Sequence, residues 1–189
     1  MEFVKKNPII VLIAGKARSG KGTVSKYFEE EFLKLGYKVV CSPYTKYLKK
    51  YIEEITGEGI DDNNKPRDLL QKISSELIKK ELDDSKFFIR RQIEDINLYS
   101  YFMDVILIDD VRFPDEIDLI KDKFSNVVSI GVERKDYIST LTKEQQGDIT
   151  EIALDDYLGF DYKILNTSES LLREKTLEIF YKIREDVRE

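Results

Sequence analysis

The sequence predicts an α/β fold in which a five-stranded parallel sheet is flanked by helices. Residues 9–14 (IIVLIA) form an unbroken apolar run, which is typical of a strand buried on both faces. Along the chain, short apolar runs alternate with longer stretches of helical period, and this favours parallel strands joined by helices. A glycine-rich turn at residues 15–23 separates the first strand from the first helix.

Each predicted element follows from this alternation. Strands are expected at residues 9–14, 38–42, 105–109, 127–132 and 162–165. Helices are expected at residues 21–35, 46–55, 66–82, 85–99, 114–123, 150–158 and 168–188. Pro66 and Pro114 suit the first turns of their helices, and Gly36 suits the position just after the first helix.

The length of 189 residues allows one well-filled core, so we expect a single domain over residues 1–189. Two segments interrupt the alternation: a mostly helical stretch at 43–103, longer than one crossover needs, and a polar stretch at 134–150. Insertions after strand ends lie where ligands bind in open parallel sheets. The first would hold an acceptor and the second would act as a lid; a helical cover and a surface loop are the alternatives.

Composition excludes several classes of function. The net charge of −6 gives no support for binding a nucleic-acid polymer. The absence of histidine excludes His-based acid–base chemistry, and the single Cys41 excludes an internal disulfide. With no apolar run of membrane-spanning length and no signal peptide, we expect a cytoplasmic protein that does not associate with membranes.

The glycine-rich turn fits a phosphate-binding loop, because residues 15–23 read GKARSGKGT, or G-x-x-x-x-G-K with a hydroxyl close behind. Backbone N–H groups in such a turn converge on an anion, and the helix start adds its partial positive charge. Lys21 supplies a mobile charge for the outer phosphates. The predicted ATP phosphate contacts are Gly15, Arg18, Ser19, Gly20, Lys21, Gly22 and Thr23.

One departure inside the loop is informative. The residue after the lysine, usually a Ser or Thr that ligates Mg²⁺, is Gly22, and the hydroxyl follows at Thr23. The G-K-G-T arrangement resembles that of adenylate kinase and other nucleoside monophosphate kinases, which indicates small-molecule phosphoryl transfer. It makes direct contact of Thr23 with the metal a weaker expectation.

The strand predicted at 105–109 leads into two carboxylates, Asp109 and Asp110. A carboxylate beside a phosphate loop can hold Mg²⁺, directly or through water. Side-chain alternation places the two on opposite sides, so that one faces the loop, and the residues leave open which one. Arg112 would neutralise charge that builds up during transfer. Alternatively, Arg112 is a surface residue that pairs with Asp115 or Glu116.

Other candidates lie in the predicted helices. Arg67 is in a first turn that favours an anion, and Gln71, one turn later, could read a base edge. Arg90 and Arg91 diverge by about 100°, so at most one faces a shared site. As isolated residues, Arg67 and Gln71 would more often be solvated surface groups. The aromatic residues Phe87, Phe88, Tyr99, Tyr101 and Phe102 would form either core or a homodimer interface.

Taken in order, the segments GKARSGKGT, KPRDLLQ, DDVRFPDEI and TEIAL…FDYKILN resemble the deoxynucleoside monophosphate kinase family known mainly from bacteriophages. The resemblance spans nearly the whole chain, and its selective part is DVRFP combined with R-x-L-L-Q. It implies the three-layer fold of the P-loop nucleoside monophosphate kinases, with the acceptor-binding insertion at 43–103 and the lid at 134–150. A phage-encoded enzyme would work in the host cytoplasm.

The resemblance also implies the reaction: with Mg²⁺, the γ-phosphoryl group of ATP passes to a deoxynucleoside 5′-monophosphate. Lys21, Asp110 and Arg112 would be catalytic, with Asp110 serving the metal. Contacts with the acceptor nucleotide are implied for Arg67, Gln71, Tyr44 and Arg91, and a lid contact for Arg134. Thr150 replaces an expected serine, and the lid is poor in arginine, so either Arg18, Arg91 and Arg112 compensate or turnover is modest.

Two other functions stay open. A kinase for another small phosphorylated acceptor, such as phosphomevalonate or dephospho-coenzyme A, would share the loop without a base-reading pocket. A non-catalytic ATP-binding regulator would bind nucleotide and signal through its helical insertion. The sequence does not determine the base preference of the acceptor.

Overall fold

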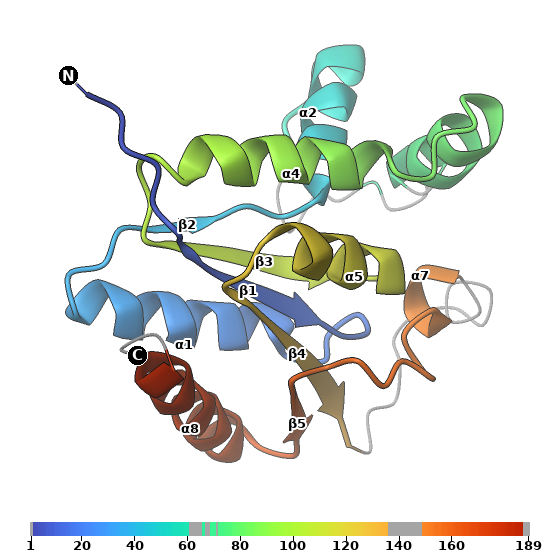
Figure 1. Ribbon diagram of the computed structural model, residues 1–189. Helices are drawn as coiled ribbons and strands as arrows, with labels where there is room; N and C mark the ends of the chain where they lie inside the picture. The colour runs from blue at the N-terminus through green and yellow to red at the C-terminus, as the bar shows by residue number, and fades with distance from the viewer. Residues whose placement is uncertain (1, 61–65, 67–68, 71, 136–148, 187–189) are drawn as a thin grey trace.

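The computed structural model describes residues 2–60, 66, 69–70, 72–135 and 149–186 (Figure 1). Five strands form one sheet in the order β2-β3-β1-β4-β5, and every neighbouring pair is parallel, as predicted. The strands are β1 (Ile9–Ala14), β2 (Val39–Cys41), β3 (Val105–Val111), β4 (Val127–Arg134) and β5 (Tyr162–Asn166). The order places β1 in the centre, so the turn that follows it lies at the middle of the sheet edge.

Helices cover both faces of the sheet. They are α1 (Lys21–Lys34), α2 (Thr45–Thr56), the π-helix η1 (Lys72–Glu81), α4 (Phe87–Tyr99), α5 (Pro114–Lys123), α7 (Ile149–Ile152) and α8 (Glu169–Asp186). In Figure 1, α1 and α8 lie on one side of the sheet, and α4 and α5 lie on the other. Helix α2 and η1 are on the α4 side, so most of the 43–103 segment adds to that layer.

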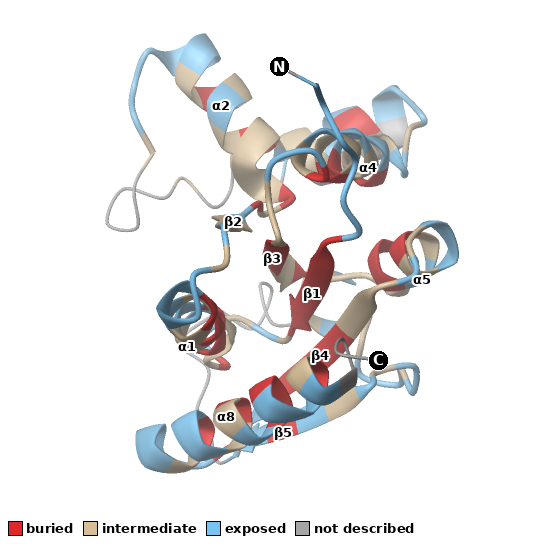
Figure 2. Cartoon of the chain, turned by 60° about the vertical axis from the view of Figure 1, so that its left-hand side comes forward, coloured by how far each residue is buried: buried red, intermediate tan, exposed pale blue. Residues whose placement is uncertain are grey.

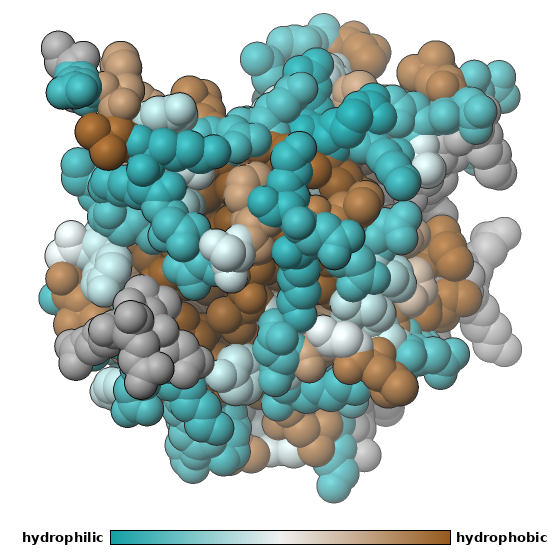
Figure 3. Space-filling view, viewed as in Figure 1, coloured by the Kyte–Doolittle hydropathy of each residue, from teal (hydrophilic) through white to brown (hydrophobic). Residues whose placement is uncertain are grey.

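The core has two halves, divided by the central strand. All six residues of β1 are buried, which explains its continuous apolar run (Figure 2). On one face, Val11 packs in a cluster with Phe28 and Phe180 from α1 and α8. On the other face, Leu12 and Ile96 belong to the second cluster, under α4 and α5. Hydrophilic side chains predominate on the face seen in Figure 3, with apolar ones visible between them.

The prediction for residues 150–158 was wrong in length, because the helix ends at Ile152. The chain continues in turns, with Asp155 N–H donating to the carbonyl of Ile152 and Tyr157 N–H to that of Leu154. These turns place Leu154 and Tyr157 against the second core cluster, which outweighs helix continuation. The first part of the helix predicted at 66–82 lies largely outside the described residues.

The aromatic cluster divides between core and surface. Phe88 and Tyr99 pack against the second core cluster, whereas Tyr101 and Phe102 are exposed and contact the ring of Phe3. A homodimer interface there stays a prediction. None of the helices within the described residues offers an apolar stretch of the length that a bilayer span requires.

Candidate functional site

The turn after β1 is shaped by close neighbours. Gly15 has a φ of +153°, and a Cβ atom there would lie 2.4 Å from the carbonyl oxygen of Val132 on β4. Gly20 has a φ of +107°, and its Cβ would lie 2.6 Å from Asn166 Nδ2 on β5. Both positions therefore require glycine. Because Gly20 is the N-cap residue of α1 and has no side chain, the first N–H groups of the helix face no cap and are suited to an anion.

Asn166 supports this turn, a role that the sequence reasoning missed. Its Nδ2 donates to the carbonyl of Ser19 at 2.8 Å, and Asn166 is only 9% exposed. Ser19 is itself buried, and its N–H donates to the carbonyl of Lys16 at 3.2 Å. Neither Gly15 nor Ser19 is among the described residues that line the cleft, and the phosphate contacts predicted for both stay predictions. Both residues shape the turn.

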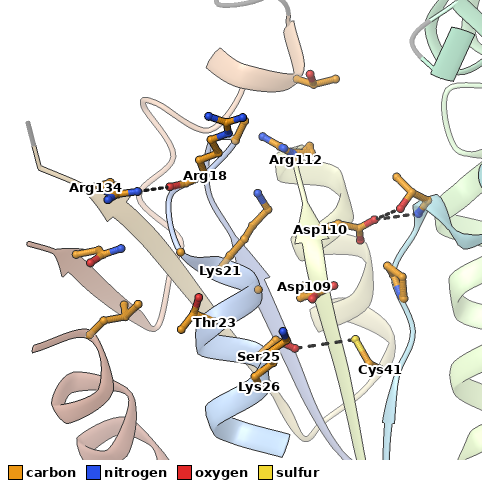
Figure 4. Close-up of a pocket in the computed structure, with 18 of the residues that line it drawn as sticks. Arg18, Lys21, Thr23, Ser25, Lys26, Cys41, Asp109, Asp110, Arg112 and Arg134 are labelled. Atoms are coloured by element: carbon orange, nitrogen blue, oxygen red, sulfur yellow. Dashed lines mark hydrogen bonds between the residues drawn. The ribbon is translucent and has the colours of Figure 1, made fainter. Parts of the chain in front are cut away.

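A cleft of about 1180 Å³ runs from this turn across β3 to α2 and η1 (Figure 4). We call its first part the loop end; it is lined by Ala17, Arg18, Gly20, Lys21, Gly22 and Thr23. We call its other part the α2 end; it is lined by Pro43, Thr45, Leu48, Lys49, Leu70 and Ser74. Asp109, Asp110 and Arg112 line the cleft as well, so the structure brings together most residues predicted for transfer. Most α2-end residues come soon after the carboxyl end of β2. Because ligands bind at this end of the strands in open parallel sheets, that position in the sequence could have identified them.

Lys21 projects from the start of α1 into the cleft. Its Nζ donates to the carbonyl of Lys16 at 3.1 Å, within the same turn. Burial, and after it the nearby Arg112 guanidinium, lower the pKa of Lys21 to about 8, against the opposing effect of Glu151 and Asp110. The ammonium is thus partly desolvated and close to a second cation, a state that an incoming anion would relieve.

Asp109 and Asp110 have different surroundings, as side-chain alternation predicted. The carboxylate of Asp110 accepts hydrogen bonds from the N–H groups of Tyr44 and Thr45 at 2.8 and 2.9 Å, and from Thr45 Oγ1 at 2.7 Å. It therefore anchors the start of α2, and its contact with the metal stays a prediction.

Asp109 lies on the α1 side of β3, below Lys21 in Figure 4. Burial raises the pKa of its carboxyl, and the neighbouring Asp110 charge adds to the rise, while Lys21 opposes it. Mg²⁺ takes oxygen ligands and commonly keeps several waters, binding through one or two carboxylates and substrate phosphates. Asp109 fits that requirement. Within the described residues, no group of three or more His, Cys, Asp or Glu side chains could hold a metal without a substrate.

Arg112 does not pair with Asp115, and its contact with Glu116 is through its backbone N–H, which donates to Glu116 Oε2 at 2.7 Å. Its guanidinium Nη1 donates instead to Glu151 Oε1 at 2.9 Å. The other oxygen of Glu151 accepts the N–H of Ala17, in the loop end, at 2.8 Å. Sequence reasoning gave Glu151 no role, because it is 39 residues from Arg112 and only the fold brings them together.

Two predicted acceptor contacts, Tyr44 and Arg91, are not among the described residues that line the cleft. Tyr44 is 4% exposed, and its hydroxyl donates to the carbonyl of Glu116 at 2.9 Å, so its side chain is part of the core. Arg91 lies exposed on α4, pairs with Glu94 and stacks over Tyr47, outside the described lining of the cleft. Arg67 and Gln71 lie outside the described residues. Arg134 lines the cleft, and its Nη1 donates to the carbonyl of Arg18 at 3.4 Å.

No family model matches the sequence, and no curated protein sequence matches it. Solved structures do. The APS kinase of Mycobacterium tuberculosis in complex with AMPPNP and APS matches at 11% identity, covering 95% of this chain and 99% of that one, with a TM-score of 0.52. A shikimate kinase from Bacteroides thetaiotaomicron matches at 14% identity, covering 93% and 98%, with a TM-score of 0.51. A gluconokinase from Sinorhizobium meliloti matches at 11% identity, covering 98% of each chain, with a TM-score of 0.50.

These structures are kinases that share one fold. Their sequence identity to this chain is low, so the similarity shows only the fold. The resemblance to deoxynucleoside monophosphate kinases therefore stays a prediction. Sheet order, the turn after β1 and these matches agree that the chain has the fold of the P-loop kinases.

Proposed function

We propose that the protein is a kinase that transfers the γ-phosphoryl group of ATP to a deoxynucleoside 5′-monophosphate. The observation that carries this proposal is the single cleft that joins the loop end, the β3 carboxylates and the α2 end. A phosphate loop occupies only one end of that volume. The remainder has room for a second substrate, whose reacting oxygen would lie beside Arg112 and Asp109.

The loop end would hold the donor phosphates through the N–H groups at the start of α1 and through Lys21. When bound, Mg²⁺ would neutralise part of the phosphate charge, and Asp109 would be the residue that holds it. Arg112 would screen charge on the transferring group. A monophosphate acceptor already presents a nucleophilic oxygen, so alignment and screening of two anions suffice without a general base. A chain without histidine suits this mechanism.

The α2 end supports a small acceptor of mixed character. Leu48 and Leu70 offer apolar surface, Thr45 and Ser74 offer hydroxyl groups, and Lys49 offers a positive charge. A nucleotide presents a flat apolar ring, polar ring edges and an anionic phosphate, and this set of side chains matches those features. The choice of a deoxynucleoside monophosphate rests on the KPRDLLQ and DVRFP segments, including Arg67 for the acceptor phosphate.

A panel of acceptors assayed with ATP and coupled ADP detection tests the proposal. Acceptor-dependent ADP release with at least one deoxynucleoside monophosphate is expected. Release only with phosphomevalonate, dephospho-coenzyme A or APS would replace the acceptor; APS belongs in the panel because of the likeness to APS kinase. Tight ATP binding without ADP release for any acceptor would indicate a regulator.

A further inference from the structure

We propose that the carboxylate of Glu151 is a built-in competitor for the anion position of the loop end, so that donor phosphates must displace it. The inference rests on the proposed function, since it concerns the donor of that reaction. Glu151 belongs to α7, which lies on the side of the sheet where the strands end (Figure 1).

The contacts of Glu151 are those of a bound anion. One oxygen accepts the backbone N–H of Ala17 at 2.8 Å, and the other accepts Nη1 of Arg112 at 2.9 Å. A backbone N–H from a phosphate loop together with a guanidinium is the donor set that phosphate oxygens use. An ionised carboxylate only accepts hydrogen bonds, as does a phosphate at these positions. One donor set cannot serve both anions at once.

The ion pair between Arg112 and Glu151 is largely shielded from solvent, unlike a surface ion pair. The side chains of Arg112 and Glu151 are 23% and 11% exposed. At such exposure, a guanidinium left without an acceptor would be costly, so Glu151 stays until another anion replaces it. The surroundings favour an anion at this point, because Arg18, Lys21 and Arg134 line the same part of the cleft.

A second carboxylate of the same segment holds it against the loop. Asp155 Oδ1 pairs with Lys16 Nζ at 2.8 Å, on the surface side of the turn. Glu151 and Asp155 thus contact two adjacent residues of the turn after β1, Ala17 and Lys16 respectively. The exposed Asp155 pair contributes little energy, so Glu151 is the residue on which displacement depends.

In the alternative to competition, Glu151 only holds Arg112 in the position from which Arg112 contacts the donor phosphates. The two roles predict opposite signs for the same substitution. If Glu151 competes, Glu151→Gln removes the competing charge and tightens donor binding. If Glu151 positions Arg112, the same change loosens Arg112 and weakens donor binding.

The experiment is calorimetric titration of AMPPNP with Mg²⁺, and separately of inorganic tripolyphosphate, into the wild type, Glu151→Gln and Asp156→Asn. The last is a matched control, because it removes the same charge from an exposed position five residues away. We expect Glu151→Gln to lower the Kd of both ligands about five- to tenfold, within the usual range of coupled binding equilibria. Asp156→Asn should leave both unchanged. Tripolyphosphate carries no nucleobase. A lower Kd for tripolyphosphate in Glu151→Gln would therefore show that the substitution acts on phosphate binding.

An unchanged or raised Kd in Glu151→Gln, with normal binding by the wild type, would overturn the competition and leave the donor site intact. Failure of wild type and variants alike to bind either ligand would overturn the donor site as well. Circular dichroism establishes that each variant is folded. If Glu151→Gln does not fold, Glu151→Asp, which keeps the charge but shortens its reach, must lower the Kd in the same direction.

Discussion

The loop end and the α2 end of the cleft are built in different ways. At the loop end, the backbone is held by buried neighbours: a Cβ on Gly15 or Gly20 would lie within 2.6 Å of an atom of another strand. At the α2 end, side chains from α2 and η1 line the cleft. The loop end therefore tolerates little change, whereas the α2 end can change its specificity by exchange of side chains.

The largest effect is expected at Lys21. Lys21→Met should lower phosphoryl transfer about a thousandfold, because it removes the one loop-end ammonium that the proposed mechanism places at the outer phosphates. Coupled ADP release at saturating acceptor measures the loss, and Lys34→Met, at the far end of α1, is the control. Turnover equal to wild type would remove Lys21 from the mechanism.

Substitutions of Asp109 and Asp110 test whether one carboxylate serves the reaction and the other the structure of the α2 end. Asp109→Asn should lower kcat about a hundredfold without loss of stability, since Asp109 would hold the metal. Asp110→Asn should instead lower the free energy of unfolding by about 1–2 kcal/mol, because its carboxylate accepts the N–H groups at the start of α2. Steady-state kinetics and urea denaturation of both variants separate the roles. A loss of kcat in Asp110→Asn together with a loss of stability in Asp109→Asn would instead indicate that Asp110 holds the metal.

Asn166 tests how strongly the loop end depends on its support. Asn166→Ala removes the donor to the buried carbonyl of Ser19, and we expect a loss of about 1–3 kcal/mol in the free energy of unfolding. ATP affinity should fall with it, because the turn loses its support from β5. Lys163→Ala, at an exposed position of β5 outside the described lining of the cleft, is the control. Unaltered stability and ATP affinity would show that the loop end keeps its shape without this bond.

Arg67 tests the α2 end. Arg67→Ala should raise the acceptor KM about tenfold with little change in kcat, as expected when ground-state binding of an anion is lost. Arg91→Ala is the matched control, because Arg91 lies on the exposed face of α4. Steady-state titration of the acceptor at saturating ATP measures both. An unchanged KM in Arg67→Ala would rule out Arg67 as the phosphate contact.

The smallest effect concerns pH. The pKa of Lys21 is lowered from 10.5 to about 8, so below about pH 8 the folded protein holds a poorly solvated charge. Between about pH 8 and 10.5 the unfolded chain binds a proton that the folded chain lacks, and this contribution to stability rises with pH. Lys21→Met should therefore stabilise the protein by about 1 kcal/mol at pH 7, where the charge is poorly solvated. Urea denaturation of both proteins at pH 7 and near pH 10 should show that advantage shrinking; an advantage independent of pH would contradict it.

Much of the fold could be predicted because its signals are local. The apolar run of β1 and the helical period of α1 define the strand and the helix on either side of the predicted phosphate-binding turn. The pattern failed at residues 153–158, where Leu154 and Tyr157 gain more from the core than from helix continuation. Tyr44 is a similar case: an aromatic residue beside a strand end can face a ligand or the core, and in the folded chain the ring of Tyr44 is buried.

By itself, the sequence determined the glycine-rich turn after β1, the parallel α/β architecture and the pair of carboxylates at the end of β3, since each depends on neighbours in the chain. Tertiary structure alone decided which carboxylate serves α2, which side chain supports Ser19, and that Glu151 contacts both Ala17 and Arg112. These partners are separated by 39 to 147 residues in the chain. Hydrogen bonds act over about 3 Å, so only the folded chain determines which groups make them.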